Sequence, residues 1–227
     1  MRILLTRPEA DARKSAQALG AEGFDALIAP LFEIGATDAS KPEGNFTALI
    51  ATSAHAFDAL MSNVSSLPMH VVGERTAEAA QRKGFHVTQI AADGENLARM
   101  IGEGAQHFLY LAGRERRPEL EAQLTQQGHH VTPWIVYETK SAQQFPAQAK
   151  AALAAGEIDA VLHFSTRSAA LYRELAQAAG IEPQALAPAQ IAISARAARE
   201  LAGAKRITIA PTPDLAGLIS ALKALSS

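Results

Sequence analysis

The chain has 227 residues, a net charge of −2, 48% hydrophobic residues and 19% charged residues. This composition is ordinary for a globular protein, and the near-neutral charge gives no reason to expect a nucleic-acid or membrane partner. The absence of cysteine excludes disulfides and cysteine-ligated zinc, and no apolar run reaches the roughly 18 residues that a membrane-spanning helix needs.

Short apolar runs alternate along the chain with segments of helical periodicity. Strands separated by helices are typical of parallel sheets with helices on both faces, and uninterrupted apolar runs indicate strands that are buried on both sides. We therefore predict an α/β fold. In chain order, the expected strands are 3–5, 26–28, 49–51, 71–72, 87–90, 108–111, 135–136, 161–164, 191–193 and 207–209, and the clearest expected helices are 10–19, 54–61, 74–83, 97–103, 119–127 and 168–179.

Several blocks of the sequence occur twice, as when ALIATSAHAFDAL is followed later by AVLHFSTRSAAL. An internal repeat of α/β units predicts two similar parallel-sheet domains with flanking helices, and we expect the active site in the cleft between them. The paired blocks are 3–33 with 108–138, 48–60 with 160–171, and 71–85 with 191–204.

Two proline-containing segments, APLFEI and TPWIVYET, break the alternation at equivalent points of the repeat. We expect them to cross between the domains, so that the first domain is discontinuous. A connection of two strands restricts domain motion but still permits opening and closing. The predicted limits are 1–32 and 139–227 for the first domain, 36–133 for the second, and 29–35 and 134–139 for the paired crossover linkers.

Two pairs of small hydroxyl residues follow expected strands where helices begin: Thr52 with Ser53, and Ser165 with Thr166. One interpretation is helix capping, since serine and threonine are preferred at helix N-termini. The other is ligand binding, because parallel sheets bind ligands at the carboxyl ends of their strands, where free N–H groups can hold an anion. The two interpretations are compatible.

The segment GERT opens the helix after the expected strand at 71–72. Gly73 permits a tight turn and a close approach of a ligand to the backbone, and Thr76 could donate to a carboxylate. As structure alone, this is an ordinary strand–helix turn. The chain has neither a GxGxxG nor a GxxxxGK[ST] motif, which disfavours a nucleotide site.

Arginine and tyrosine supply the other candidates. Arg7 follows the first strand and Arg117 ends the basic cluster GRERR, and arginine binds carboxylates in a bidentate manner. For Arg114 and Arg116 we favour a solvated helix start. Tyr137 lies on the second crossover, where it either packs its ring or donates a proton or hydrogen bond to a leaving group. The seven histidines show no metal-ligand spacing.

Taken in order, these motifs resemble the uroporphyrinogen-III synthase family. The segments that carry the resemblance span the chain: ILLTRP, LIATSAHAFDAL, VVGERTAEAAQRKGF, LYLAGRERRPELEAQLTQQGHHVTPWIVYET, DAVLHFSTRSAA and APTPDLAGLISAL. The resemblance implies two α/β domains joined by a two-stranded antiparallel linker. It also implies the cyclisation of linear hydroxymethylbilane to uroporphyrinogen III, with loss of water and inversion of ring D, without a metal or cofactor.

The resemblance implies that Tyr137 is catalytic and assists departure of the bilane hydroxyl. One departure lies in the second glycine turn, where Ser194 replaces a glycine and Ala197 a threonine, so that one donor is lost. The residues that we expect to bind substrate, from the motifs and from the resemblance, are Arg7, Thr52, Ser53, Gly73, Thr76, Arg117, Ser165 and Thr166.

An alternative is a non-catalytic two-domain protein that binds a small polyanionic ligand. For the enzyme we expect a small-molecule substrate, hydroxymethylbilane, and no nucleic acid or membrane partner. The resemblance implies a monomer, with a transient contact to the preceding pathway enzyme. The apolar stretch of MRILLTRPEAD is too short for a signal peptide, so we expect a cytoplasmic location.

Overall fold

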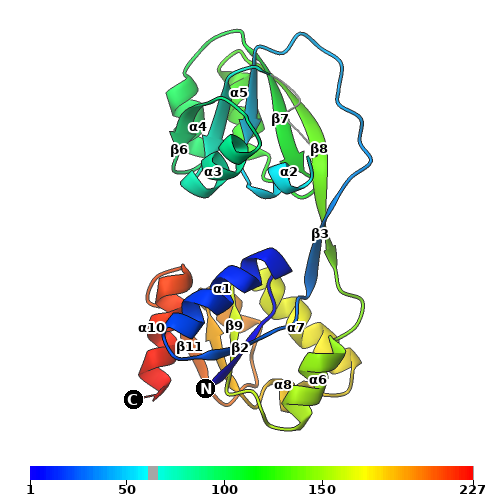
Figure 1. Cartoon of the computed structure of the whole chain (residues 1–227), viewed down its shortest axis with the longest axis vertical. Helices are drawn as coiled ribbons and strands as arrows, with labels where there is room; N and C mark the ends of the chain where they lie inside the picture. Colours follow the sequence, from blue (N-terminus) through cyan, green and yellow to red (C-terminus); the bar gives the residue numbers. More distant parts are fainter. Residues whose placement is uncertain (61–65, 227) are drawn as a thin grey trace. The chain divides into compact units, whose positions relative to one another are not determined.

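A computed structural model of the chain describes residues 1–60 and 66–226. The chain divides into two compact units: unit 1 comprises Met1–Glu33 and Lys140–Ser227, and unit 2 comprises Ile34–Thr139. Each unit contains helices and a mostly parallel sheet, labelled in Figure 1. The predicted α/β class is confirmed, and the expected cleft stays a prediction.

The sheet of unit 1 has the strand order β11-β10-β9-β1-β2, and all neighbouring strands are parallel. Its strands are β1 (Arg2–Leu5), β2 (Asp25–Ile28), β9 (Ala160–His163), β10 (Ala189–Ala192) and β11 (Ile207–Ile209). Its helices are α1 (Glu9–Ala21), α6 (Ala147–Ala154), α7 (Thr166–Ala178), α8 (Glu182–Ala185), α9 (Ala195–Arg199) and α10 (Leu215–Ser226).

Strand β1 explains why unit 1 has helices on both faces of its sheet. Successive side chains of a strand point to opposite faces. Leu4 joins a core with α6, α7, α8 and α9, whereas Ile3 and Leu5 join a second core with α1 and α10. All three side chains are fully buried, and each such burial contributes about 1.5–3 kcal/mol relative to exposure. The uninterrupted apolar run therefore belongs to a strand covered on both sides.

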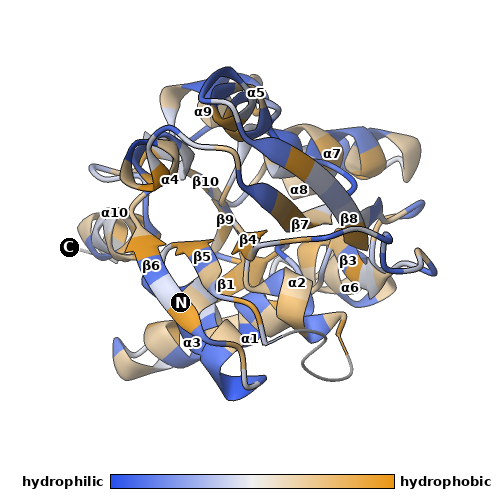
Figure 2. Ribbon diagram, turned by 90° about the horizontal axis from the view of Figure 1, so that it is seen from above, coloured by the Kyte–Doolittle hydropathy of each residue, from blue (hydrophilic) through white to orange (hydrophobic). Residues whose placement is uncertain are grey.

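The sheet of unit 2 has the order β3-β8-β7-β4-β5-β6. Its strands are β3 (Phe32–Ala36), β4 (Ala48–Ala51), β5 (Met69–Val72), β6 (Val87–Ala91), β7 (His107–Gly113) and β8 (His130–Ser141), and its helices are α2 (His55–Asp58), α3 (Glu74–Arg82), α4 (Gly94–Ile101) and α5 (Glu119–Gln126). Strand β4 is apolar throughout and is orange in Figure 2. Helices α2 and α3 cover one face of the sheet and α4 and α5 the other.

The pair β3–β8 differs from the other strand pairs of this sheet. Thr37 N donates to the Val136 carbonyl and Ala142 N to the Leu31 carbonyl, at 3.1 and 2.8 Å. Residue numbers rise on one strand as they fall on the other, so β3 and β8 are antiparallel. The pairs from β8 to β6 are parallel.

Strand β8 contains an irregularity next to Tyr137. Its pairing with β7 is regular up to Ala112 with Ile135, but Gly113 is then opposite Tyr137, so that Val136 is an extra residue. An extra residue breaks the alternation of faces and re-aims the side chain that follows it. Val136 and Tyr137 consequently both contact the core beneath α2 and α3.

The helix expected at 54–61 is much shorter in the structure. Helix α2 covers only His55–Asp58, and position 61 of the prediction lies outside the described residues. The Leu60 carbonyl accepts a hydrogen bond from Lys83 Nζ at 2.6 Å, so that a side chain satisfies this carbonyl beyond the helix end.

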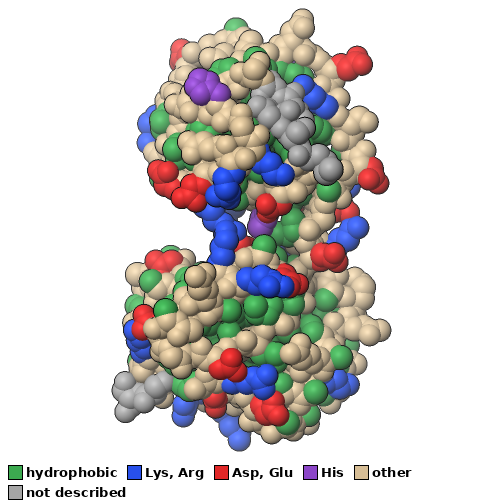
Figure 3. All heavy atoms as spheres, in the orientation of Figure 1, with side chains coloured by type: hydrophobic (Ala, Val, Ile, Leu, Met, Phe, Trp, Pro, Cys, Tyr) green, Lys and Arg blue, Asp and Glu red, His purple; other side chains and the backbone are tan. Residues whose placement is uncertain are grey.

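Charged side chains of both signs are interspersed on the face drawn in Figure 3. This distribution agrees with the small net charge of the chain. No helix in the described ranges is both long and apolar enough to cross a membrane.

Candidate functional site

A cavity of about 690 Å³ lies at the carboxyl ends of the parallel strands of unit 2. This edge is where open parallel sheets bind ligands, because the loops and helix starts converge there. The lining residues come from the turn after β4, from the end of β5, from within β7 and β8, from the start of α4, and from α5 and the segment that leads into it. Thr52, Ser53, Arg117 and Tyr137, four of the predicted site residues, all line it.

Two hydroxyl groups form a hydrogen-bonded pair in the cavity wall. The Thr52 Oγ1 and Tyr110 Oη atoms are 2.7 Å apart. Tyr110 is only 3% exposed, and burial is the main cause of the raised pKa of its phenol. The phenol therefore stays protonated at neutral pH and keeps its hydrogen for a hydrogen bond.

Ser53 is held in the turn that follows β4. Its Oγ accepts a hydrogen bond from His55 N at 3.3 Å, and its carbonyl accepts one from Ala56 N at 3.2 Å. Ala54 directly precedes α2 and has helical backbone angles, so the Ser53 hydroxyl that accepts from His55 N caps the start of this short helix. Capping thus accounts for Ser53, whereas the Thr52 hydroxyl bonds to Tyr110.

The Tyr137 ring fits against a glycine. A Cβ atom at Gly113 would lie 2.6 Å from Tyr137 Cζ and 2.8 Å from its Oη. The Tyr137 backbone is held as well, since Arg114 N donates to its carbonyl at 2.9 Å. The His55 ring lies 6.1 Å away, measured between ring centroids. Glycine at 113 thus leaves the space that the phenol occupies at the cavity wall.

Most charges around the cavity have partners of their own. Arg116 pairs with Glu121 at 2.7 Å, and Glu95 with Arg99 at 2.9 Å. The Asp93 carboxylate caps α4 by accepting from Asn96 N at 2.8 Å. In the described part of the chain no ion pair is found for Arg117, which leaves its guanidinium for an anionic ligand.

Gly73 and Thr76 lie next to the cavity wall but do not line it. Gly73 has a φ of +83° and is the N-cap residue of α3, as expected for a tight turn. Thr76 is 5% exposed, within the buried face of α3. Val72 is the residue of this turn that reaches the cavity.

Arg7 follows β1, and Ser165 and Thr166 follow β9, its neighbour in the unit 1 sheet, so all three lie at the carboxyl edge of that sheet. The Arg7 guanidinium lies 4.2 Å from the centroid of the Phe164 ring and donates to Ser15 Oγ at 3.0 Å. Ser165 caps α7 by accepting from Ser168 N at 3.0 Å, and the reciprocal bond completes a capping box.

The altered second turn retains a structural role. Ser194, in place of the family glycine, is the N-cap of α9 and accepts from Ala197 N at 3.2 Å. A serine cap stabilises a helix start by about 1 kcal/mol.

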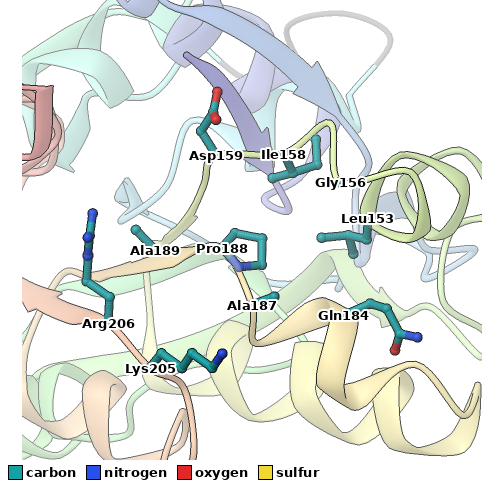
Figure 4. Close-up of a pocket in the computed structure, with 10 residues that line it drawn as sticks. All are labelled: Leu153, Gly156, Ile158, Asp159, Gln184, Ala187, Pro188, Ala189, Lys205 and Arg206. Carbon is teal, nitrogen blue, oxygen red and sulfur yellow. The ribbon is translucent and has the colours of Figure 1, made fainter.

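A second cavity, of about 500 Å³, lies at the opposite edge of the unit 1 sheet, near the amino ends of β9, β10 and β11 (Figure 4). Lys205 and Arg206 line it together with Asp159 and with apolar residues such as Pro188. None of the predicted site residues lies there.

Sequence reasoning missed Tyr110, the most buried polar side chain of the unit 2 cavity wall. Its signal is a single phenol within the otherwise apolar centre of the strand HFLYLAG. No cluster of three or more potential metal ligands is found within residues 1–60 and 66–226.

The fold and the cavity define a two-unit α/β protein in which hydroxyl, phenol and guanidinium groups line a cavity of unit 2. Uroporphyrinogen-III synthetase from Helicobacter pylori has a similar structure, with a TM-score of 0.63, 20% identity and coverage of 99% of this chain and 100% of the other. A mutant uroporphyrinogen III synthase from Thermus thermophilus gives a TM-score of 0.53, 15% identity and coverage of 99% and 98%. These similarities establish the fold. No curated protein matches the chain.

The model of the family described as uroporphyrinogen-III synthase HemD matches residues 13–220, and the chain belongs to this family. The chain is thus a cyclising lyase of tetrapyrrole biosynthesis, which converts hydroxymethylbilane to uroporphyrinogen III.

Proposed function

We propose that the unit 2 cavity is the place where this chain acts on hydroxymethylbilane, with Tyr137 as its general acid. The observation that carries the proposal is the position of the Tyr137 phenol. It lines a cavity at the carboxyl ends of parallel strands, beside Thr52, Ser53 and Arg117, in a member of a synthase family. The cavity therefore combines a proton donor with donors suited to carboxylates.

The first chemical step is the loss of the bilane hydroxyl as water. The phenolic O–H of Tyr137 can transfer its proton to the departing oxygen. The C–O bond breaks as the pyrrole nitrogen supplies electrons, which leaves an azafulvene-type cation and a tyrosinate. Ring D then attacks through its substituted carbon, the spiro intermediate fragments and recloses, and the proton released on closure returns to Tyr137.

Positioning contributes more than proton transfer to this reaction. The bilane also closes unaided, without inversion of ring D, so that the protein has to direct an already reactive chain. Holding reacting groups in the correct geometry can supply about 7–11 kcal/mol of a barrier. We propose that Thr52, Ser53 and Arg117 do this in unit 2 by binding substrate carboxylates.

The remaining assignments concern residues that do not line the unit 2 cavity. Ser165 already caps a helix and Arg7 already has partners, yet both lie at the carboxyl edge of the unit 1 sheet, as a ligand-binding role requires. Thr166, Gly73 and Thr76 stay predicted substrate-binding residues. We also propose a cofactor-independent monomer that works in the cytoplasm and takes unstable bilane from the preceding enzyme by transient contact.

The test is to generate hydroxymethylbilane in situ, add the protein, oxidise the products and separate the type I and type III isomers. We expect mainly type III from the wild type. Tyr137→Phe should slow turnover by about 100-fold, the lower part of the range for a general acid, while the remaining product stays type III because positioning persists.

Tyr172→Phe is the matched control, since Tyr172 is buried in unit 1 and donates to the Ala185 carbonyl. The turnover rate of this control should be within about twofold of the wild-type rate, because no group that lines the cavity is changed. Unchanged turnover in Tyr137→Phe would remove Tyr137 from the mechanism. Type I alone from the wild type, at the rate without protein, would favour the polyanion-binding alternative.

A further inference from the structure

Tyr110 lies in the cavity wall and has no role in the mechanism above. Strand β7 is parallel to β4, and Tyr110 is opposite Ile50. Thr52 is two residues beyond Ile50, on the same side of the chain, because side chains alternate with a period of two. The Tyr110 ring is buried against the core beneath α4 and α5, and its hydroxyl reaches Thr52.

The hydroxyl pair has two hydrogens, and its hydrogen bond uses one of them. A phenol is a much stronger acid than an aliphatic alcohol, so Tyr110 is the better donor and Thr52 the better acceptor. When Tyr110 donates to Thr52, the Thr52 hydrogen remains for another acceptor. No further hydrogen bond of the Thr52 hydroxyl is found among the described residues, and Thr52 lines the cavity.

We propose that Tyr110 is a positioning residue, which holds the Thr52 hydroxyl as a hydrogen-bond donor toward a carboxylate of the bound bilane. The proposal rests on the proposed function of the cavity. It assigns a distinct task to each phenol there: Tyr137 transfers a proton, whereas Tyr110 orients a neighbour and stays protonated throughout. Thr52 alone would rotate among staggered positions, and the short bond from Tyr110 selects one of them.

The kinetic test compares Tyr110→Phe, Thr52→Val, their double variant and Thr52→Ser, with Tyr172→Phe as the control. Losing a positioned hydrogen bond to a bound substrate group should raise KM about fivefold to tenfold and leave kcat within about twofold. The double variant should resemble Thr52→Val, because Tyr110 acts only through the Thr52 donor that valine removes. Thr52→Ser keeps the hydroxyl and should retain a KM near that of the wild type.

Three kinetic results would overturn the proposal. One is an unchanged KM in Tyr110→Phe, which would leave the tyrosine a purely structural role. Another is a fall in kcat with KM unchanged, which would place Tyr110 in the chemical step. The third is a double variant whose KM is the product of two independent effects, since the hydroxyls would then act separately.

A second measurement separates failure of this proposal from failure of the proposed function. The tyrosine Fermi doublet in the Raman spectrum reports whether a phenol donates or accepts a hydrogen bond. The difference spectrum between the wild type and Tyr110→Phe should show a donor, and the affinity of both proteins for uroporphyrin III should differ about fivefold to tenfold. If the wild type forms no type III isomer, these two readouts still decide the role of Tyr110. An acceptor doublet or equal affinities would refute it.

Discussion

Replacing Gly113 with alanine should displace the phenol of Tyr137 without touching the tyrosine itself. The new Cβ would lie 2.6 Å from Tyr137 Cζ, whereas ordinary contacts begin near 3.4 Å, so the two must separate by about 0.8 Å. A misplacement of about 1 Å in a positioned group can reduce turnover by about 100-fold. The overpacked site should also lose about 1–3 kcal/mol of stability.

The assay is the isomer analysis with bilane made in situ, together with urea unfolding of each variant. Gly20→Ala is the matched control, because a Cβ at this position in α1 has no atom within 4 Å. It should keep wild-type turnover and gain up to about 1 kcal/mol of stability. We expect Gly113→Ala to lose turnover while it remains folded at the assay temperature.

The decisive variant carries Gly113→Ala together with Tyr137→Phe. If Gly113 acts only by placing the phenol, alanine at this position should slow the Tyr137→Phe protein by no more than about twofold. Full turnover in Gly113→Ala, or equal losses from alanine in both backgrounds, would refute the reasoning.

Two further predictions concern stability in unit 1. Ser165→Ala should lower the free energy of unfolding by about 1 kcal/mol in urea titrations, because it removes the capping box of α7; an unchanged value would show that the cap contributes nothing. Burial lowers the pKa of His163 to about 4 from 6.5, and its bond to Gln190 opposes this only in part. Between pH 6.5 and about 4, His163 therefore binds a proton in the unfolded chain but stays neutral in the native protein. The free energy of unfolding should fall by up to about 1.4 kcal/mol per pH unit from pH 6.5 to about 4. Below about pH 4, His163 should cause no further loss. Urea titrations across this range should show a flatter profile for His163→Gln, and equal slopes would refute the assignment.

The fold could be predicted from the sequence because the short apolar runs and the order of motifs along the chain both indicate the same α/β architecture. Ile3, Leu4 and Leu5 form an uninterrupted apolar run, as is typical of a strand that is covered on both faces. The resemblance of ordered motifs across the chain then indicated the family, which the match over residues 13–220 shows.

The site was accessible only in part, because its geometry depends on pairing between distant strands. The extra residue at Val136 and the contact of Tyr137 with Gly113 follow from the register of β7 against β8, which no local pattern displays. In the sequence, Tyr110 is indistinguishable from other strand residues. Only the pairing of β4 with β7 shows that Thr52 lies beside its hydroxyl. The predicted helix 54–61 is too long because the apolar pattern continues through Ala59 and Leu60, whereas α2 ends at Asp58.

The strand order of unit 1 also has a consequence for how the chain is synthesised. Strand β1 is synthesised before unit 2, but its partner β9 begins at Ala160, after all of unit 2 has been made. Unit 2 is continuous in sequence and can close its sheet while the three buried side chains of β1 still lack the cover of α10 and α7. Domains generally fold as units during synthesis, so β1 is made before unit 2 but belongs to the unit that is completed after it, and its apolar side chains stay uncovered in the meantime.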